Sequence, residues 1–328
     1  MMTKLPQLCV GIDIGGTKTQ LRAVRADDGG IVADTVVSTS GWRRREWNAD
    51  AATLLDMVSG LVAPSGGETA AIAIGAHGCD DADECEAFQS AFARLSRYPI
   101  RVVNDAELMP LAVGLGNQIG IVSGTGSIGV CRSPQRGMLV AGGWGWIVGD
   151  DGSAPALVRE AVRAVGLHFD RGGSRRGDPL VEAMFDTMGV ISIPRLGSVI
   201  SSLGSAAAVG EYAIMVFDAA AAGSALARRV IDEGGRALAQ LAIHLNDRGA
   251  GASHAIAGGS VIAAQPMLWD AFSDAIAELG AGAIEPHLFS GKPVAGACLL
   301  ARSILAEARG GTSSVSENPT AFRTSIQE

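Results

Sequence analysis

The chain has 328 residues and a net charge of −8; 48% of its residues are hydrophobic and 18% are charged. It is long enough for two domains and apolar enough for a large core, which excludes a disordered chain. The acidic balance argues against nucleic acid or an anionic membrane as a general partner. It does not argue against a phosphate site, because such sites are built from local backbone groups.

The cysteine content argues against disulfides and metal clusters. Five cysteines are scattered along the chain, and no C-x-x-C pair occurs. Since no secretory signal stands at the start, we expect a cytoplasmic protein. The most apolar helical stretch, about 213–227, is interrupted by Asp218, so no membrane span is expected. No spacing typical of a metal site links the histidines at positions 168, 244, 254 and 287.

The first third of the chain predicts a mixed sheet. Three strands come first, and the turn Asp27-Asp28-Gly29-Gly30 between the second and third predicts an antiparallel meander. Helices and buried strands then alternate, which is typical of α/β proteins with crossover helices. The expected strands are 8–14, 19–26, 31–38, 70–75 and 100–103, and the expected helices are 49–62, about 83–95 and 105–113.

A second strand–turn–strand unit follows, and it resembles the first at its glycine-rich turn. This faint repeat predicts a duplicated fold in which two glycine turns face a shared cleft. We expect strands at 118–123, 127–132, 137–141 and 253–257, and helices at about 153–166, 205–222, 224–246 and 293–308. The polar segment 170–178 is predicted to be a surface loop, and residues 309–328 a loose tail.

The first glycine turn lies within G-I-D-I-G-G-T-K-T, residues 11–19. Gly15 and Gly16 have no Cβ, so their amides can approach phosphate oxygens, and Thr17 adds a hydroxyl donor. Asp13, at the end of the strand, can hold a hydrated Mg²⁺, and Lys18 adds positive charge. The alternative is a plain β-turn; the Walker A pattern is absent.

The second glycine turn is Ser123-Gly124-Thr125-Gly126-Ser127, and alone it could be only a flexible turn. Gly124, Thr125 and Gly126 match the first turn as a second phosphate clamp, and the two turns support each other. Farther along, Gly258 and Gly259 end a strand before a helix, where a glycine pair lets adenosine lie flat on the backbone.

Asn104 and Asp105 follow a buried strand, at the sheet edge where open α/β sheets place ligands. Phosphoryl transfer to an alcohol needs a carboxylate that accepts the hydroxyl proton, and Asp105 is the candidate. The alternative is that Asn104 or Asp105 only caps the helix that follows.

Residues 142–153 read G-G-W-G-W-I-V-G-D-D-G-S. Asp150 is expected to accept hydrogen bonds from sugar hydroxyls, and the tryptophans 144 and 146 either shape the cleft wall or lie in the core. His77 could bond a sugar hydroxyl, although a structural role is the more usual one for a loop histidine. The acids at 80–84 are expected to be a solvated helix start.

In this order, the motifs resemble those of the N-acetylglucosamine kinase branch of the BadF/BadG/BcrA/BcrD ATPase family. The resemblance spans about residues 8–305 and implies a two-lobed, actin-like (ribonuclease H-like) ATPase fold with duplicated mixed sheets and flanking helices. It implies an N-terminal lobe of residues 1–113, rejoined by helix 293–308, and a C-terminal lobe of residues 114–292.

The resemblance also implies roles. Asp105 would be the base, Gly258 and Gly259 would meet the nucleotide, and Asn104, Gly143, Trp144 and Asp150 would contact the sugar. The expected activity is ATP- and Mg²⁺-dependent transfer of the γ-phosphate to the 6-hydroxyl of an amino sugar, by a homodimer. N-acetylglucosamine is the first choice and glucosamine the second, because a cationic 2-amino group would gain from the carboxylates of Asp150, Asp151 and the acids at 80–84. Asp151 stands where the family usually has a glutamate, so its side chain at the edge of the sugar pocket is shorter.

Two further alternatives remain open. An activator of a 2-hydroxyacyl-CoA dehydratase would carry cysteines for a shared iron–sulfur cluster, and the scattered cysteines argue against it. A sensor without catalysis would not need Asp105. The clustered cysteines of the zinc site in ROK sugar kinases are missing here, which argues against that sister family.

Overall fold

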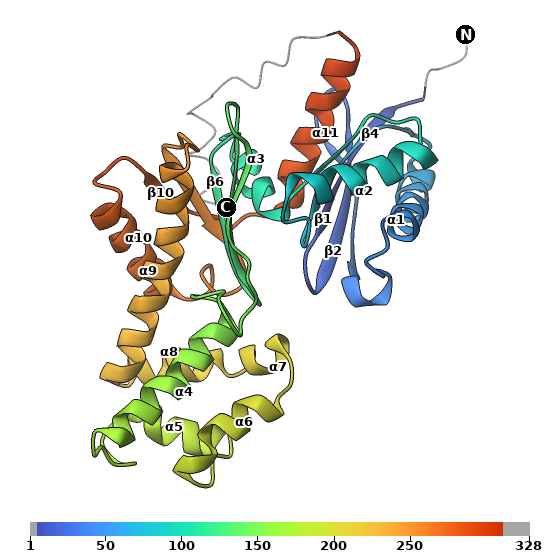
Figure 1. Cartoon of the computed structure of the whole chain (residues 1–328). Helices are drawn as coiled ribbons and strands as arrows, with labels where there is room; N and C mark the ends of the chain where they lie inside the picture. Colours follow the sequence, from blue (N-terminus) through green and yellow to red (C-terminus); the bar gives the residue numbers. More distant parts are fainter. Residues whose placement is uncertain (1–4, 311–328) are drawn as a thin grey trace. The chain divides into compact units, whose positions relative to one another are not determined.

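The computed structural model describes residues 5–310, which divide into two compact units (Figure 1). The first unit contains the chain up to residue 120, residues 130–139 and the chain from residue 291. The second contains residues 121–129 and 140–290. Each unit is described by itself below.

The first unit contains a five-stranded mixed sheet with the order β3-β2-β1-β4-β5. Strands β1 to β3 form the antiparallel meander that the turn at 27–30 predicts, and β4 and β5 continue it in parallel from β1. All five strands agree with the sequence prediction to within about two residues at each end. Their bounds are β1 Gln7–Ile14, β2 Lys18–Arg25, β3 Ile31–Ser38, β4 Glu68–Ala76 and β5 Ile100–Val103.

Helices cover both faces of this sheet. Successive side chains of β1 point to opposite faces, so they pack against different helices. Val10 and Ile12 belong to a core that also contains Phe88 of α2 and Leu54 of α1. Cys9 faces the other way, in a core with residues of α11. Helix α11 approaches so closely that a Cβ on Gly11 would lie 2.5 Å from a backbone nitrogen of the helix. The helices are α1 Trp47–Val62, α2 Ala82–Leu95, α3 Leu108–Ala112 and α11 Val294–Ala308.

The second sheet has the order β10-β9-β6-β7-β8, which repeats the plan of the first sheet. Strand β6 takes the place of β1, and β9 and β10 take the places of β4 and β5. The duplicated mixed sheets expected from the two glycine turns are therefore confirmed. The strands are β6 Ile119–Ser123, β7 Ser127–Ser133, β8 Gly137–Gly142, β9 His254–Gly258 and β10 Glu285–Leu288.

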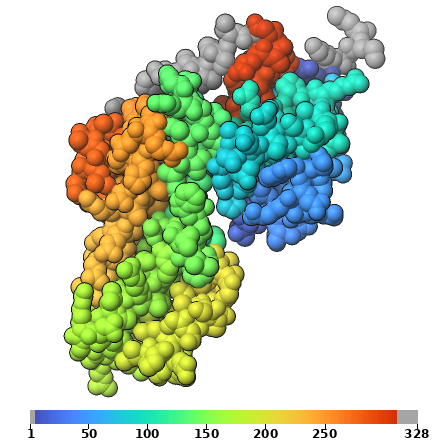
Figure 2. Space-filling model, viewed as in Figure 1, coloured from blue at the N-terminus to red at the C-terminus, as the bar shows by residue number. Residues whose placement is uncertain are grey.

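Seven helices of the second unit are described, and those from α4 to α8 pack on one another at one end of it (Figures 1 and 2). The predicted helix 205–222 is wrong as one element: it is divided at Gly210, where a Cβ would lie 3.1 Å from Ala154. Helices α5 and α6 and strand β10 were not predicted, and α10 was expected only as a helix of unspecified bounds after the glycine pair. The bounds are α4 Ala154–Asp170, α5 Pro179–Thr187, α6 Leu196–Ser202, α7 Ala206–Gly210, α8 Ala213–Ala221, α9 Ala225–Asp247 and α10 Pro266–Leu279.

Two smaller predictions concern the loop at 170–178 and the tail at 309–328. The loop is shorter than expected, because α4 continues to Asp170 and Asp178 caps α5. The tail lies outside the described residues from position 311 onward. Among residues 5–310, no helix is both long and apolar enough to cross a membrane.

Candidate active site

Three strands of the first sheet end level with one another, and their ends carry the ionisable residues of the candidate site. Asp13 of β1 lies opposite Gly75 of β4, and Gly75 lies opposite Val103 of β5. His77 directly follows β4, and Asp105 lies two residues beyond Val103. The parallel register therefore brings Asp13, His77 and Asp105 to one edge of the sheet, where ligands bind in open α/β folds.

His77 lies next to both Asp105 and the first glycine turn. Its Nδ1 is 3.9 Å from Oδ2 of Asp105, and its backbone N–H donates to the carbonyl of Ile14 over 2.8 Å. A Cβ on Gly16 would lie 3.7 Å from its ring. The side chain of Asp105 is 16% exposed and that of His77 is 45% exposed, so both are accessible to a ligand.

Both aspartates have raised pKa values. Burial raises the pKa of Asp105 most strongly; the Asp80 carboxylate raises it further, and His77 opposes the rise. Burial, with help from the charge of Asp105, raises the pKa of Asp13 to about 7. Carboxylates with raised pKa values at a sheet edge are typical of catalytic and cation-binding sites, because a bound cation or a proton stabilises them.

Asn104 is fully buried, and its side chain is engaged by the protein. Its Oδ1 accepts from the N–H of Ala106 over 2.9 Å, in a capping box with Glu107. Its Nδ2 donates to the carbonyl of Cys79 over 3.0 Å and to Oδ1 of Asp80 over 3.1 Å. The capping alternative thus describes what Asn104 does in this structure, and its contact with a sugar stays a prediction.

The acids at 80–84 divide into two groups. Asp81 caps α2 by accepting from the N–H of Glu84, and Glu84 accepts in return from the N–H of Asp80. These contacts are those of a capped helix start, as expected. Asp80 differs from the others, because its carboxylate contacts Asn104 and raises the pKa of Asp105.

The first glycine turn is held by hydrogen bonds from a threonine that the sequence did not single out. Gly15 donates its N–H to the carbonyl of Lys18 over 2.9 Å, where β2 begins. Thr39 donates its hydroxyl to the carbonyl of Gly15 over 2.9 Å and its N–H to the carbonyl of Thr17. Gly16, Thr17 and Lys18 are exposed, so the outer surface of the turn stays free for a ligand.

The second turn is held instead by the segment 150–153. Ser123 donates its hydroxyl to the carbonyl of Gly152 over 2.8 Å, and Ser127 donates to that of Asp151 over 2.9 Å. Thr125 at the tip is exposed. The acidic segment therefore fixes the base of this turn, which explains why the two motifs occur together.

Asp150 itself lies against the turn. Its φ of 54° is left-handed, and its carboxylate accepts from the N–H groups of Gly145 and Ser127. Burial raises its pKa. Asp151 forms an ion pair with Arg159 of α4.

The tryptophan-containing loop is exposed. Trp144 is 75% exposed, so the alternative in which both tryptophans belong to the core is wrong for this one. Trp146 is partly buried, and Arg159 donates to its carbonyl. Gly143 has a φ of 76° and donates its N–H to the carbonyl of Ser127 over 2.9 Å. The apolar side of the loop is available for a ligand.

The glycine pair after β9 lies against the second turn. Gly258 is the last residue of β9, and Gly259 has a φ of 107°. A Cβ on Gly259 would lie 2.4 Å from the carbonyl oxygen of Ser123, a separation that no side chain can adopt. Gly259 is thus required for the close approach that brings Ser260 beside Gly124.

Two arginines that the sequence did not single out lie beside the loop after β4, and one of them, Arg43, interacts with the charge of Asp105. Arg43 and Arg45 follow the turn that holds Thr39, and their guanidinium groups reach within 4 Å of where a Cβ on Gly78 would lie. The buried Nε of Arg43 is the one buried side-chain donor among the described residues without a hydrogen-bond partner. Burial lowers the pKa of Arg43, whereas the charge of Asp105 raises it. The run of three arginines at 43–45 was the signal available in the sequence.

These residues fit a magnesium nucleotide. The two glycine turns present exposed backbone at Gly16 and Thr125, which a phosphate can approach. The raised pKa of Asp13 shows a carboxylate that a cation would stabilise at the same edge as Asp105. Carboxylate oxygens reached through water are the kind of ligand that Mg²⁺ prefers.

Comparisons with known proteins agree with this fold. Residues 10–301 match the BadF/BadG/BcrA/BcrD ATPase family. This chain therefore belongs to that family of ATPases. It is 31% identical, over 172 residues, to an N-acetylmuramic acid/N-acetylglucosamine kinase from Clostridium acetobutylicum. That match covers 51% of this chain and 56% of the relative, so it spans about half of each.

Solved structures show the same fold. A proposed N-acetylglucosamine kinase from Chromobacterium violaceum matches with a TM-score of 0.62 at 20% identity, over 90% of this chain and 99% of that one. A ROK family glucokinase from Streptomyces griseus, solved with glucose and AMPPNP, matches with a TM-score of 0.55 at 20% identity, over 90% and 98%. The actin-like ATPase fold expected from the sequence is confirmed.

Proposed function

We propose that this protein is an ATP-dependent kinase that phosphorylates the 6-hydroxyl of an amino sugar, with N-acetylglucosamine as its first substrate. The observation that carries the proposal is the edge of the first sheet. A carboxylate with a raised pKa, Asp105, lies there beside His77 and the first glycine turn. Membership in an ATPase family and the partial match to an amino-sugar kinase support it.

In this mechanism Asp105 accepts the proton of the sugar hydroxyl as the hydroxyl attacks the γ-phosphate. Its raised pKa makes it a stronger base than an exposed aspartate. In the first unit, backbone N–H groups of the turn at Gly15 and Gly16 would bind phosphate oxygens. In the second unit, the turn at 124–126 and the pair Gly258 and Gly259 would offer backbone groups to a nucleotide. Asp13 would hold Mg²⁺ through water, and the ion would supply positive charge to the phosphates.

The charges around the site favour a neutral acetamido group over a cationic amine. Surplus carboxylates would favour the cationic amine of glucosamine, but Asp151 is paired with Arg159 and Asp150 accepts two backbone N–H groups. Arg43 adds a positive charge near Asp105. A protonated 2-amino group would be repelled by this arginine, whereas the carbonyl of an acetamido group could accept from the outer nitrogens of its guanidinium group.

The test is an assay of ADP release with N-acetylglucosamine, glucosamine and glucose, and the position of the phosphate in the product is assigned by NMR. We expect the specificity constant for N-acetylglucosamine to exceed that for glucosamine by about ten- to a hundredfold, as the loss of one charge-assisted contact implies. A preference for glucose would refute the amino-sugar assignment, and a product not phosphorylated at the 6-hydroxyl would refute the regiochemistry.

The role of Arg43 has its own matched pair. Arg43→Gln should raise the KM for the sugar by about tenfold, because the charge-assisted donor is lost. Arg44, exposed and next in the chain, serves as the control, and Arg44→Gln should leave KM unchanged. Equal effects of the two substitutions would remove Arg43 from the sugar site.

A further inference from the structure

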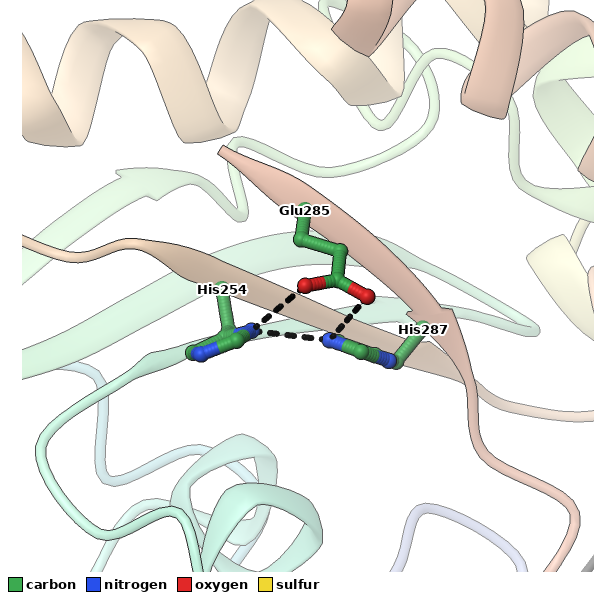
Figure 3. A group of neighbouring side chains, drawn as sticks. All are labelled: His254, Glu285 and His287. Atoms are coloured by element: carbon green, nitrogen blue, oxygen red, sulfur yellow. Dashed lines mark hydrogen bonds and ion pairs between the residues drawn. The ribbon is translucent and has the colours of Figure 1, made fainter. Parts of the chain in front are cut away.

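His254, Glu285 and His287 lie together on the second sheet (Figure 3). His254 is the first residue of β9 and Glu285 the first of β10, and the two are directly opposite each other in the parallel register. His287 lies two residues beyond Glu285, hence on the same face of β10. The strand pairing alone therefore brings the three side chains together.

The distances among the three side chains are within about half an ångström of those in a tetrahedral metal site. Nδ1 of His254 lies 2.8 Å from Nε2 of His287, and the two rings lie 3.7 and 3.8 Å from the Glu285 carboxylate oxygens. Ligands held about 2.0–2.1 Å from a tetrahedral Zn²⁺ are about 3.3 Å apart. Shifts of about half an ångström would bring all three pairs to that separation.

The structure assigns a binding site for a divalent transition metal, with Zn²⁺ as the best fit, to His254, Glu285 and His287. Two imidazoles and a carboxylate suit zinc and its neighbours in the transition series and do not suit Mg²⁺, which prefers oxygen ligands. In the structure the two facing nitrogens share one proton in a hydrogen bond. Metal binding requires the donating ring to carry that proton on its other nitrogen instead, so this ring changes tautomer and no proton has to leave the protein.

The position of the site points to a structural role for the metal. The three ligands lie at the strand beginnings, and Gly258, which ends β9, is four residues from His254, or about 13 Å along the strand. Strand β10 has only four residues and lies at the edge of its sheet. A metal that joins β10 to β9 would hold this short edge strand in register, at a distance from the phosphate-binding end.

The sequence shows no spacing that would indicate this site, because His254 and His287 lie 33 residues apart in the chain. Two of the ligands, Glu285 and His287, are separated by one proline, which is a weak signal for a metal site on a strand. In addition, β10 itself was not predicted. Without β10, nothing in the sequence places these residues opposite His254.

The experiment measures zinc in untagged protein after dialysis against Zn²⁺ without nucleotide, with binding constants from competition with a coloured chelator. We expect one equivalent of zinc in the unaltered protein, and no competition by millimolar Mg²⁺. Glu285→Gln, at an exposed side chain, and His287→Ala should each weaken binding at least tenfold. The control His244→Ala, at an exposed histidine of α9, should not.

Two further measurements keep the inference testable if His287→Ala folds poorly. Co²⁺ should give the intense visible absorption of a tetrahedral site, and Glu285→Gln should reduce it. Zinc should raise the Tm of the unaltered protein but not that of Glu285→Gln. Substoichiometric zinc, or equal binding by Glu285→Gln and His244→Ala, would show that the two histidines form only a hydrogen bond. None of these readouts depends on kinase activity.

Discussion

The two sheets repeat one strand order, yet the residues at their corresponding edges differ in chemistry. At positions related by that order, the first sheet carries Asp13, His77 and Asp105, and the second carries Val122, Gly259 and Ser290. The first edge thus has ionisable groups that can move a proton or hold a cation. The second has backbone and hydroxyl groups, which suit binding of phosphate and nucleoside.

The two glycine turns also differ in the groups that support them. The first is supported by the hydroxyl of Thr39, while its outer surface stays exposed beside His77. The second is held by carbonyl groups of the segment 150–153 and by the close approach of Gly259. On the proposed function, the duplicated backbone would provide two binding turns, and the ionisable side chains of the first sheet would provide catalysis. The predictions below test this division.

The largest effect is expected at the base. Asp105→Asn should lower kcat by about a hundredfold or more, since general-base catalysis contributes about 10²–10⁴ in rate. Nucleotide affinity, measured by calorimetry, should change little. Asp83→Asn, at an exposed carboxylate in the first turn of α2, is the control and should retain its turnover. Near-native turnover in Asp105→Asn would mean that Asp105 does not act as the base.

In the second unit, we expect a change of backbone geometry at Gly259 to lower the free energy of unfolding. Gly259→Ala places a Cβ 2.4 Å from the carbonyl oxygen of Ser123 at a φ of 107°, and we expect a loss of about 2–4 kcal/mol in the free energy of unfolding. Gly282→Ala is the matched control, because Gly282 has a φ of 78° but nothing within 4 Å. It should cost only the left-handed strain, about 1–2 kcal/mol. Equal losses in urea titrations would contradict the close approach.

The free energy of unfolding should depend on pH through Asp13, at the ionisable edge of the first sheet. The pKa of Asp13 is about 7 in the folded protein, against about 3.9 in an unfolded chain. Between these values the folded state holds a proton that the unfolded state has lost, so this contribution is fully present below pH about 4 and is lost as pH rises through 7.

The measurement is the free energy of unfolding in the presence of a chelator, without ligands. Asn cannot ionise, so Asp13→Asn should gain about 2–3 kcal/mol relative to the unaltered protein between pH 5 and pH 8. Asp83→Asn should follow the unaltered protein over the same range. Parallel curves for Asp13→Asn and the unaltered protein would show that Asp13 is ionised throughout.

The sequence could predict the parts of this molecule whose signals are local. The strands of the first sheet and the two glycine turns follow from short apolar runs and from glycines, which specify backbone shape directly. The position of Asp105 follows from the end of β5. The order of motifs along the chain also predicts the repeat, because the strand–turn–strand unit occurs twice.

What the sequence could not predict depends on contacts between distant segments. Strand β10 is short and contains a proline, so its pattern is weak, and its register with β9 is what brings His287 to His254. The free Nε of Arg43 and the role of Asn104 depend on which neighbours fold against them. Composition does not reveal such neighbours; strand pairing and packing determine them.

The smallest expected effect concerns the support of the first turn. The hydroxyl of Thr39 donates to the carbonyl of Gly15 and lies 2.9 Å from the hydroxyl of Thr19, which accepts from the indole of Trp42. Thr39→Val keeps the shape of the side chain but removes this connection, so the turn loses a buried hydrogen bond worth about 1 kcal/mol.

The proposed division of roles predicts that Thr39→Val changes the KM for ATP and not the KM for the sugar. Because the turn binds phosphate through its backbone, a loosened Gly15 should raise the KM for ATP by about three- to tenfold and leave the KM for the sugar unchanged. Thr53→Val is the control, since the hydroxyl of Thr53 only bonds the carbonyl of Ala49 within α1. It should lose at most a similar amount of stability and keep the KM for ATP. If both variants raise that KM equally, the effect is one of general stability, and Thr39 does not support the phosphate turn.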